Sequence, residues 1–448
     1  MSREFQYRML MYPNITRPNE FWKDSYVVLL PHIINTLKKI NKKLHITYLL
    51  PKELDSVKGT DVEWIYYDVP SNNNRMRTNF TFDANTFHQI TDFKLTPYDI
   101  VYSHLPEHTL QLSNLLFNES HSLPRFISYC HWFETTGSMS ARKKMLLMNL
   151  AGVLENEVLG VNSQWLKDYV LKNASRWFKD ETMEELDNII QVHQLGVDKI
   201  DFTQKRYSGK KKILFNHRGK GYTNFQFFVK CMDELYKKRK DFEVYTTFDD
   251  TNLGGRKKWY GGLLNLPSRD EYLKWVKDNI YLQVGTFKTY SAWSISTTDT
   301  LSMGIPSVLP SGLCYSEMVG DDYPLIYKNG SMDDFLDKIN SVLDNTTYRN
   351  KVVKSLEPRM KQMVWNRQIR SWMDWKDLFN PEKFEMCGVD TKGYKDTVRI
   401  IKKRKSVSQT QLIKELRWGV NFKFSRVRNR LRLNNKVRFT KEGYEWVG

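Results

Sequence analysis

The chain has 448 residues, a length that predicts about two to four domains. With 40% hydrophobic and 14% aromatic residues it can build sizeable cores, which excludes wholesale disorder. The net charge of +18 is uneven: residues 391–448 contain 17 basic and 4 acidic residues, whereas residues 1–390 carry only about +5. A near-neutral body with a cationic C-terminal region favours a polyanionic partner, either a nucleic acid or an anionic membrane surface.

Targeting and metal-binding patterns are not found in the sequence. No apolar run approaches the ~20 residues that a membrane-spanning helix needs, and the N-terminus has no signal-peptide core. The four cysteines are scattered, without a Cys-x-x-Cys pair or a Cys/His cluster at metal-ligand spacing. We therefore expect a cytoplasmic protein without a membrane partner, a disulfide framework or a cofactor, and we do not expect a divalent metal.

The first half of the chain alternates short apolar runs with longer helical patterns, as βαβ units of a mainly parallel sheet do. We expect a helix at 24–40, because its apolar residues recur at the helical period, with a kink at Pro31. The expected strands are 7–12, 44–49, 62–67, 99–103, 126–130 and 158–161.

A second alternating set begins at residue 212. We expect strands at 213–215, 242–245, 281–284 and 307–309, and helices that start at Asn224, Ser268, Thr297 and Ser331. The two sets predict two Rossmann-like domains, at 1–195 and 196–358. A Trp- and Met-rich helical stretch at 359–380 is expected to rejoin the first domain.

The basic C-terminal region is expected to contain a linker at 381–405 and a separate unit at 406–448. Ser408 can cap a first helix, a basic second helix follows, and a hairpin closes around 441–443. This order resembles a winged helix-turn-helix, whose second helix enters the major groove of DNA. The residues expected to contact DNA are Lys403, Arg404, Arg426, Arg428, Arg430, Lys436 and Arg438. A solvated basic cap without a DNA role is the alternative.

The pattern most typical of chemistry follows the strand at 213–215. Arg218 and Lys220 lie in a tight Gly-containing loop before a helix, and such a loop makes a diphosphate cradle because backbone N–H groups and the helix dipole add to the two charges. Asp299 opens a later helix that ends in Gly-x-Pro, and a carboxylate there can accept both hydroxyls of a ribose. Gly312 belongs to a small-residue loop that lets backbone approach a phosphate.

These motifs resemble the GT-B superfamily of nucleotide-sugar glycosyltransferases, in particular the retaining type with an E-x7-E signature. The resemblance implies an α/β fold with two Rossmann-like domains facing a cleft: an acceptor domain first and a nucleotide-sugar domain second. It implies a UDP-sugar as co-substrate, and donor-binding roles for Arg218, Lys220, Gly221, Asp299, Gly312 and Glu317. Two positions depart from the signature, because Ser291 stands where its first acid falls and Asp299 replaces its second glutamate.

The reaction centre is expected in the segment 126–137. His131 follows a strand, where this family and the phage DNA α-glucosyltransferases carry a histidine close to the donor sugar. The resemblance implies that His131 hydrogen-bonds the sugar and steadies positive charge at the anomeric carbon. Glu134 is the nearest acid, and it orients His131 or acts as the base if the reaction inverts. His104 is a second candidate at a strand end, and an aromatic structural turn is the alternative.

A GT-B body with a basic DNA-binding unit resembles the base-modifying glycosyltransferases of bacteriophages. This resemblance implies transfer of a hexose or pentose from a UDP-sugar to a hydroxymethylated pyrimidine, first 5-hydroxymethylcytosine, in duplex phage DNA in the host cytoplasm. Two rivals stay open. One is a cell-surface polysaccharide glycosyltransferase whose basic tail binds anionic lipid. The other is a non-catalytic nucleic-acid-binding regulator built on a transferase body.

Overall fold

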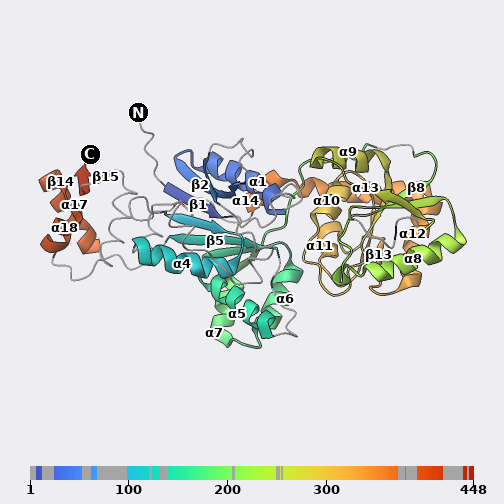
Figure 1. Ribbon diagram of the computed structural model, residues 1–448, viewed down its shortest axis with the longest axis horizontal. Helices are drawn as coiled ribbons and strands as arrows, with labels where there is room; N and C mark the ends of the chain where they lie inside the picture. The colour runs from blue at the N-terminus through green and yellow to red at the C-terminus, as the bar shows by residue number, and fades with distance from the viewer. Residues whose placement is uncertain are drawn as a thin grey trace. The chain divides into compact units, whose positions relative to one another are not determined.

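The computed structural model describes residues 7–12, 25–52, 62–67, 98–120, 124–131, 133, 140–203, 207–248, 253, 256–371, 379, 391–416, 437–440 and 443–447. The chain divides into two compact units (Figure 1). The first unit comprises Met1–Gly160, Val170–Gln191 and Trp372–Gly448, and the second comprises Val161–Tyr169 and Val192–Ser371. No helix among these described residues is long and apolar enough to cross a membrane.

The first unit is built on a seven-stranded sheet of order β3-β2-β1-β4-β5-β6-β7. Its strands are β1 (Tyr7–Tyr12), β2 (Leu44–Pro51), β3 (Glu63–Tyr67), β4 (Ile100–Ser103), β5 (Arg125–Cys130), β6 (Val158–Val161) and β7 (Ile190–Val192). Strands β1 to β5 pair in parallel. The strands expected in the first half are therefore confirmed, and the sheet follows the doubly wound order 3-2-1-4-5-6 with one more strand at its edge.

The helices of the first unit are α1 (Ser25–Ile40), α4 (Pro106–Ser120), α5 (Ser140–Leu154) and α7 (Asp180–Ile189), whereas α6 (Gln164–Ala174) begins in the segment Val161–Tyr169 of the second unit. Strand side chains alternate between faces, so Leu10 and Tyr12 share a core cluster with Leu112 and Leu116 of α4. Helices α4 and α5 approach closely at Gly152, where a Cβ would lie 1.7 Å from the carbonyl oxygen of Pro106.

The second unit contains a six-stranded sheet of order β10-β9-β8-β11-β12-β13, the same doubly wound order in a second copy. Its strands are β8 (Lys211–Phe215), β9 (Phe242–Thr246), β10 (Tyr260–Leu263), β11 (Ile280–Val284), β12 (Ser307–Pro310) and β13 (Ile326–Tyr327). Its helices are η3 (Gly221–Thr223), α8 (Phe225–Lys238), α9 (Arg269–Asn279), α10 (Ile295–Ser302), α11 (Tyr315–Val319), α12 (Met332–Asp344), α13 (Thr346–Gln362) and α14 (Trp365–Ser371). The four strands and four helices expected here are confirmed.

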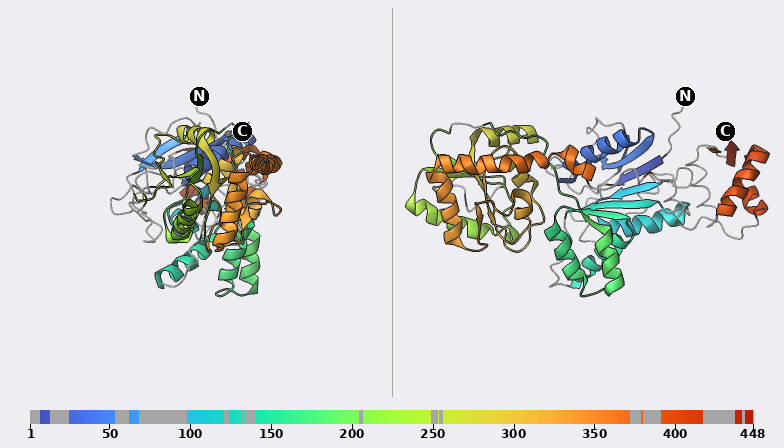
Figure 2. Two further views of the ribbon diagram at one scale, coloured as in Figure 1. Left: turned by 90° about the vertical axis from the view of Figure 1, so that its right-hand side faces the viewer. Right: turned by 180° about the vertical axis from the view of Figure 1, so that it is seen from behind.

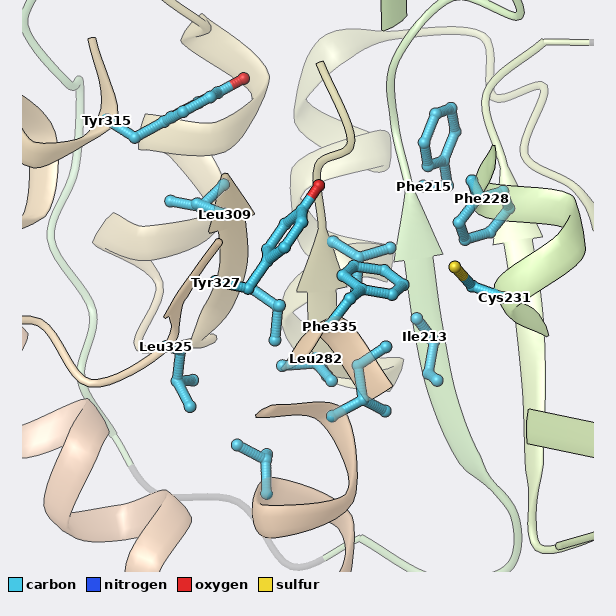
Figure 3. Close-up of a cluster of buried hydrophobic side chains, with 14 of the residues drawn as sticks. Ile213, Phe215, Phe228, Cys231, Leu282, Leu309, Tyr315, Leu325, Tyr327 and Phe335 are labelled. Carbon is cyan, nitrogen blue, oxygen red and sulfur yellow. The ribbon is translucent and has the colours of Figure 1, made fainter. Parts of the chain in front are cut away.

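The two faces of this second sheet bury different side chains of one strand. Ile213 and Phe215 of β8 join the large cluster that contains Phe228 of α8 and Phe335 of α12 (Figure 3). Leu214 points the other way and packs in a separate cluster with α9. The alternation of Ile213, Leu214 and Phe215 thus fixes a sheet covered by helices on both faces.

Helix residues 359–371 belong to the second unit, which corrects the expectation that they rejoin the first domain. The reason is a short parallel bridge between Val197 and Val364. The amide of Val197 donates to Met363 (2.8 Å), and the amide of Trp365 donates to Val197 (3.3 Å). These backbone bonds hold the end of α13 and the start of α14 against the entry strand of the second unit.

The C-terminal residues include helices and short strands (Figure 2). Their buried side chains form a hydrophobic core of their own, so we call this part the C-terminal module. It contains α17 (Thr391–Arg404), β14 (Ser406–Val407), α18 (Gln409–Glu415), β15 (Val437–Thr440) and β16 (Gly443–Trp446), with an antiparallel sheet of order β14-β16-β15. The expected cap is confirmed, since Ser408 accepts from the amide of Gln411. The expected linker is wrong for residues 391–404, because α17 buries Ile401 with Leu412 and Tyr444.

Candidate active site

In both sheets the strand order reverses beside the first strand, and in doubly wound folds ligands bind there, at the carboxyl ends of the strands. In the second unit this point lies between β8 and β11, which pair in parallel. The loop after β8 carries Arg218 and Lys220, and the loop after β11 carries Gly285 and Thr286. The topology therefore brings the predicted phosphate loop to the expected edge of the sheet.

Arg218 and Lys220 are exposed, and neither side chain makes a hydrogen bond or an ion pair with any described residue. Their loop is held from below by Thr223, whose buried hydroxyl lies 2.6 Å from the carbonyl oxygen of Arg218 and 2.7 Å from that of Lys220. Thr286 donates to the carbonyl oxygen of Thr223 (2.8 Å), which ties the loops after β8 and β11 together. Because no described acid pairs with Arg218 or Lys220, both positive charges are available to bind a diphosphate.

A buried polar network supports this loop. The side-chain amide of Gln283 in β11 lies 3.0 Å from Nε2 of His217 and 3.1 Å from Oδ1 of Asn216. Burial lowers the pKa of His217 to about 3, so the imidazole is neutral and adds no charge next to Arg218. The Asn216 amide in turn donates to the carbonyl oxygen of Ser296 (3.1 Å), at the start of α10. No local pattern in the sequence marks these residues, and only the pairing of β8 with β11 brings them together.

Asp299 is buried within α10, and Arg269 donates to both of its carboxylate oxygens at 2.8 and 2.7 Å. Burial raises the pKa of Asp299 to about 6, against the opposing effect of the Arg269 charge. Arg269 also lies 3.6 Å from a carboxylate oxygen of Asp198. Arg269 is a residue that the sequence analysis missed, although it directly follows Ser268, the N-cap of α9. The carboxylate predicted to hold a ribose thus has a protein partner.

Gly312 and Glu317, also predicted to bind the donor, have different environments. Gly312 is exposed with φ +77°, and a Cβ there would meet nothing within 4 Å, so its backbone is open to a ligand. Glu317 instead accepts hydrogen bonds from the amides of Gln164 and Trp165, both at 2.8 Å. It therefore supports the N-terminus of α6, where unpaired amides attract negative charge.

Ser291, at the place of the missing signature acid, is buried. Its hydroxyl donates to the phenolic oxygen of Tyr315 (3.0 Å), and the Cys314 thiol lies 3.8 Å away. These two partners come from the loop and helix that follow β12, so Ser291 links the segment before α10 to the start of α11.

In the first unit two predicted histidines follow adjacent parallel strands. His104 comes directly after β4 and His131 directly after β5, and these strands pair with Ser103 opposite Ser128. His104 is fully buried, and its pKa is lowered well below 6.5 by burial and then by the nearby His131. His131 is half-buried, with its ring 5.2 Å from that of Tyr129. Glu134 lies outside the described residues.

Some of the residues expected to contact DNA lie outside the described residues, and others lie within them. Arg426, Arg428, Arg430 and Lys436 lie outside the described residues. Lys403 is exposed on α17, whereas Arg404 forms an ion pair with Glu415, and Arg438 lies 3.9 Å from Glu445. Among the described residues, no group of three or more His, Cys, Asp or Glu side chains is placed to hold a metal ion.

Two doubly wound domains in one chain are the architecture of the GT-B fold. No protein-family model matches this chain, and no curated protein matches its sequence. Among solved structures, the chain is similar to sucrose-phosphate synthase from Thermosynechococcus elongatus, with a TM-score of 0.60 and 11% identity over 82% of this chain and 96% of that one.

Two further solved structures show the same likeness. A glycosyltransferase from Rickettsia africae matches with a TM-score of 0.60 and 13% identity over 84% of this chain and 99% of its own. Anabaena HepE in complex with UDP and glucose matches with a TM-score of 0.58 and 10% identity over 81% and 97%. The chain therefore has the GT-B fold expected from its sequence.

Proposed function

We propose that this protein is a glycosyltransferase that takes its sugar from a nucleotide-sugar donor, with a UDP-sugar as the first candidate. The observation that carries the proposal is the pair Arg218 and Lys220, exposed without a side-chain partner in the described structure, at the switch point of the second sheet. HepE, which shares the fold, was solved with UDP and glucose, and this supports the choice of donor.

The proposed reaction breaks the bond between the anomeric carbon and the diphosphate, and it forms a bond from that carbon to an acceptor hydroxyl. Negative charge develops on the departing diphosphate, where Arg218 and Lys220 would stabilise it. His131 is proposed to hydrogen-bond the sugar, and Glu134 to orient it or to take the acceptor proton if the reaction inverts. Gly312, and Gly221 at the start of η3, would let backbone approach the phosphate.

For the acceptor we propose a hydroxymethylated pyrimidine, first 5-hydroxymethylcytosine, in duplex DNA. Support comes from the charge of residues 391–448 and from the module's topology, helix, strand, helix and hairpin, which is compatible with a winged helix-turn-helix. The expected recognition helix falls within 417–436, outside the described residues. If the protein is phage-encoded, the reaction belongs in the host cytoplasm.

Three features favour the rival function, a non-catalytic nucleic-acid-binding regulator. Ser291 replaces one signature acid, Asp299 is engaged by Arg269, and Glu317 is engaged by α6. A transferase-like body that no longer turns over would tolerate all three features. The predicted donor contacts must therefore be tested by turnover and not by binding alone.

The experiment is mass spectrometry of short duplexes, unmodified or carrying 5-hydroxymethylcytosine or 5-hydroxymethyluracil, after incubation with a panel of UDP-sugars. A hexose or pentose mass gain on one hydroxymethylated duplex is expected. Lys220→Ala should abolish that gain while duplex binding persists. Salt-sensitive duplex binding without any mass gain would favour the regulator. Neither gain nor binding would favour the polysaccharide transferase with a lipid-bound tail.

A further inference from the structure

Helix α17 carries a row of positive charge that the sequence analysis assigned to a linker. Lys395, Arg399, Lys402 and Lys403 are exposed, and in a regular helix they fall within about 100° of arc. We call these four residues the basic face of α17. On the opposite side Thr397 and Ile401 are fully buried, so the module's own core fixes the orientation of this face.

The acids of the module do not neutralise its lysines. Each acid described there lies near an arginine: Asp396 with Arg399 (3.1 Å), Glu415 with Arg404, and Glu445 with Arg438 (3.9 Å). The described lysines, by contrast, form no ion pair and no side-chain hydrogen bond with a described residue; they are Lys395, Lys402, Lys403, Lys405 and Lys414. Lys402 alone has a ring contact, 5.7 Å from the centroid of Trp446.

We propose that the basic face of α17 binds the phosphate backbone of duplex DNA, as a docking surface separate from the expected recognition helix. This inference rests on the proposed DNA acceptor and names the surface that holds it. Lysines without partners release counterions from DNA on contact, which gives affinity that does not depend on sequence.

The structure favours DNA over a lipid surface as the occupant. A helix that lies on a membrane buries an apolar face between the headgroups. The apolar side of α17 is already used, since Val398 and Ile401 pack with Val407, Leu412 and Tyr444. What α17 presents outward is charge, which complements a phosphate backbone.

The test is fluorescence anisotropy of the full-length protein with a labelled, unmodified 25-base-pair duplex over a range of salt concentrations. The variant Lys395→Ala/Arg399→Ala/Lys403→Ala should reduce the slope of log affinity against log salt by about 1.8, the share of the two lysines without partners, because Arg399 is already paired with Asp396. It should weaken binding equally on duplexes of different sequence. The matched control, Lys351→Ala/Lys354→Ala/Lys361→Ala on α13, removes the same charge from another exposed helix face and should keep the wild-type slope.

A second variant separates loss of charge from loss of structure. Lys395→Arg/Arg399→Lys/Lys403→Arg keeps the charges and should keep the slope. Equal slopes for the alanine variant and the α13 control would overturn the proposal. Binding to phosphatidylserine vesicles is measured for the same variants, and an alanine variant that loses vesicle binding but keeps duplex binding would also overturn it. Because the duplex is unmodified, failure of sugar transfer on every substrate would defeat the proposed reaction and leave this binding result intact.

Discussion

The carboxylate of Asp299 and the guanidinium of Arg269 form a buried pair beside the proposed donor site. Asp299 is 5% exposed and bonded through both oxygens. A carboxylate in this position has two possible uses: it holds a ribose, as the resemblance implies, or it fixes α9 against α10. The two hydrogen bonds from Arg269 favour the second use, and a ribose would have to compete with Arg269.

Asp299→Asn should destabilise the protein by about 2 kcal/mol, because Arg269 then keeps a largely buried charge with Asp198 as its nearest carboxylate. Urea unfolding measures the loss. The double variant Asp299→Asn/Arg269→Gln should lose less than the sum of the two single variants. Strictly additive losses would show that the two side chains do not stabilise each other.

Sequence reasoning predicted donor-binding roles for Arg218, Lys220 and Asp299, because loop charge and helix punctuation are local signals. It missed Arg269, because the residues at the start of a helix do not indicate which distant carboxylate an arginine there will bind. The environment of Glu317 was missed for the same reason, because its partners at Gln164 and Trp165 are more than 150 residues earlier in the chain.

At the scale of elements, the entry segment of the second unit packs closely against the start of α14. A Cβ on Gly196 would lie 2.7 Å from both Cα and N of Trp365. These are backbone atoms at the start of a helix, so they cannot rotate away as a side chain does. The bridge between Val197 and Val364 depends on this close approach.

Gly196→Ala should therefore destabilise the protein by about 1–3 kcal/mol, as overpacking against fixed backbone does. Gly221→Ala is the matched control, because a Cβ there would meet nothing within 4 Å, and its effect should stay within about 0.5 kcal/mol. Thermal or urea unfolding followed by tryptophan fluorescence gives both values. An equal effect of the two substitutions would contradict the packing argument.

For the molecule as a whole, two buried histidines of the second unit predict its acid sensitivity. Burial lowers the pKa of both His193 and His217 to about 3, from 6.5. Below pH 6.5 both histidines become protonated in the unfolded chain but stay neutral in the folded one. Above pH 6.5 the two histidines therefore do not reduce the free energy of unfolding. As the pH falls from 6.5 toward 3, each of them lowers that free energy by up to about 1.4 kcal/mol per pH unit.

His217→Gln should flatten the decline of unfolding free energy between pH 6.5 and 4 relative to wild type. The substitution keeps an acceptor for Gln283 and removes the group that titrates. Urea unfolding at a series of pH values measures this, and the offset at pH 8 gives the cost of the lost packing. Parallel curves for the two proteins would refute the assignment.

The sequence by itself determined the two doubly wound sheets, because the period of apolar residues and the turn residues are encoded within short segments. It also located the basic loop after β8 and the excess charge after residue 390. Only the tertiary structure decided which unit holds residues 359–371, that α17 is a helix with a packed face, and which acids already have partners. Those outcomes depend on contacts between distant segments. Strand pairing and core packing determine these contacts, and the local sequence pattern does not predict them.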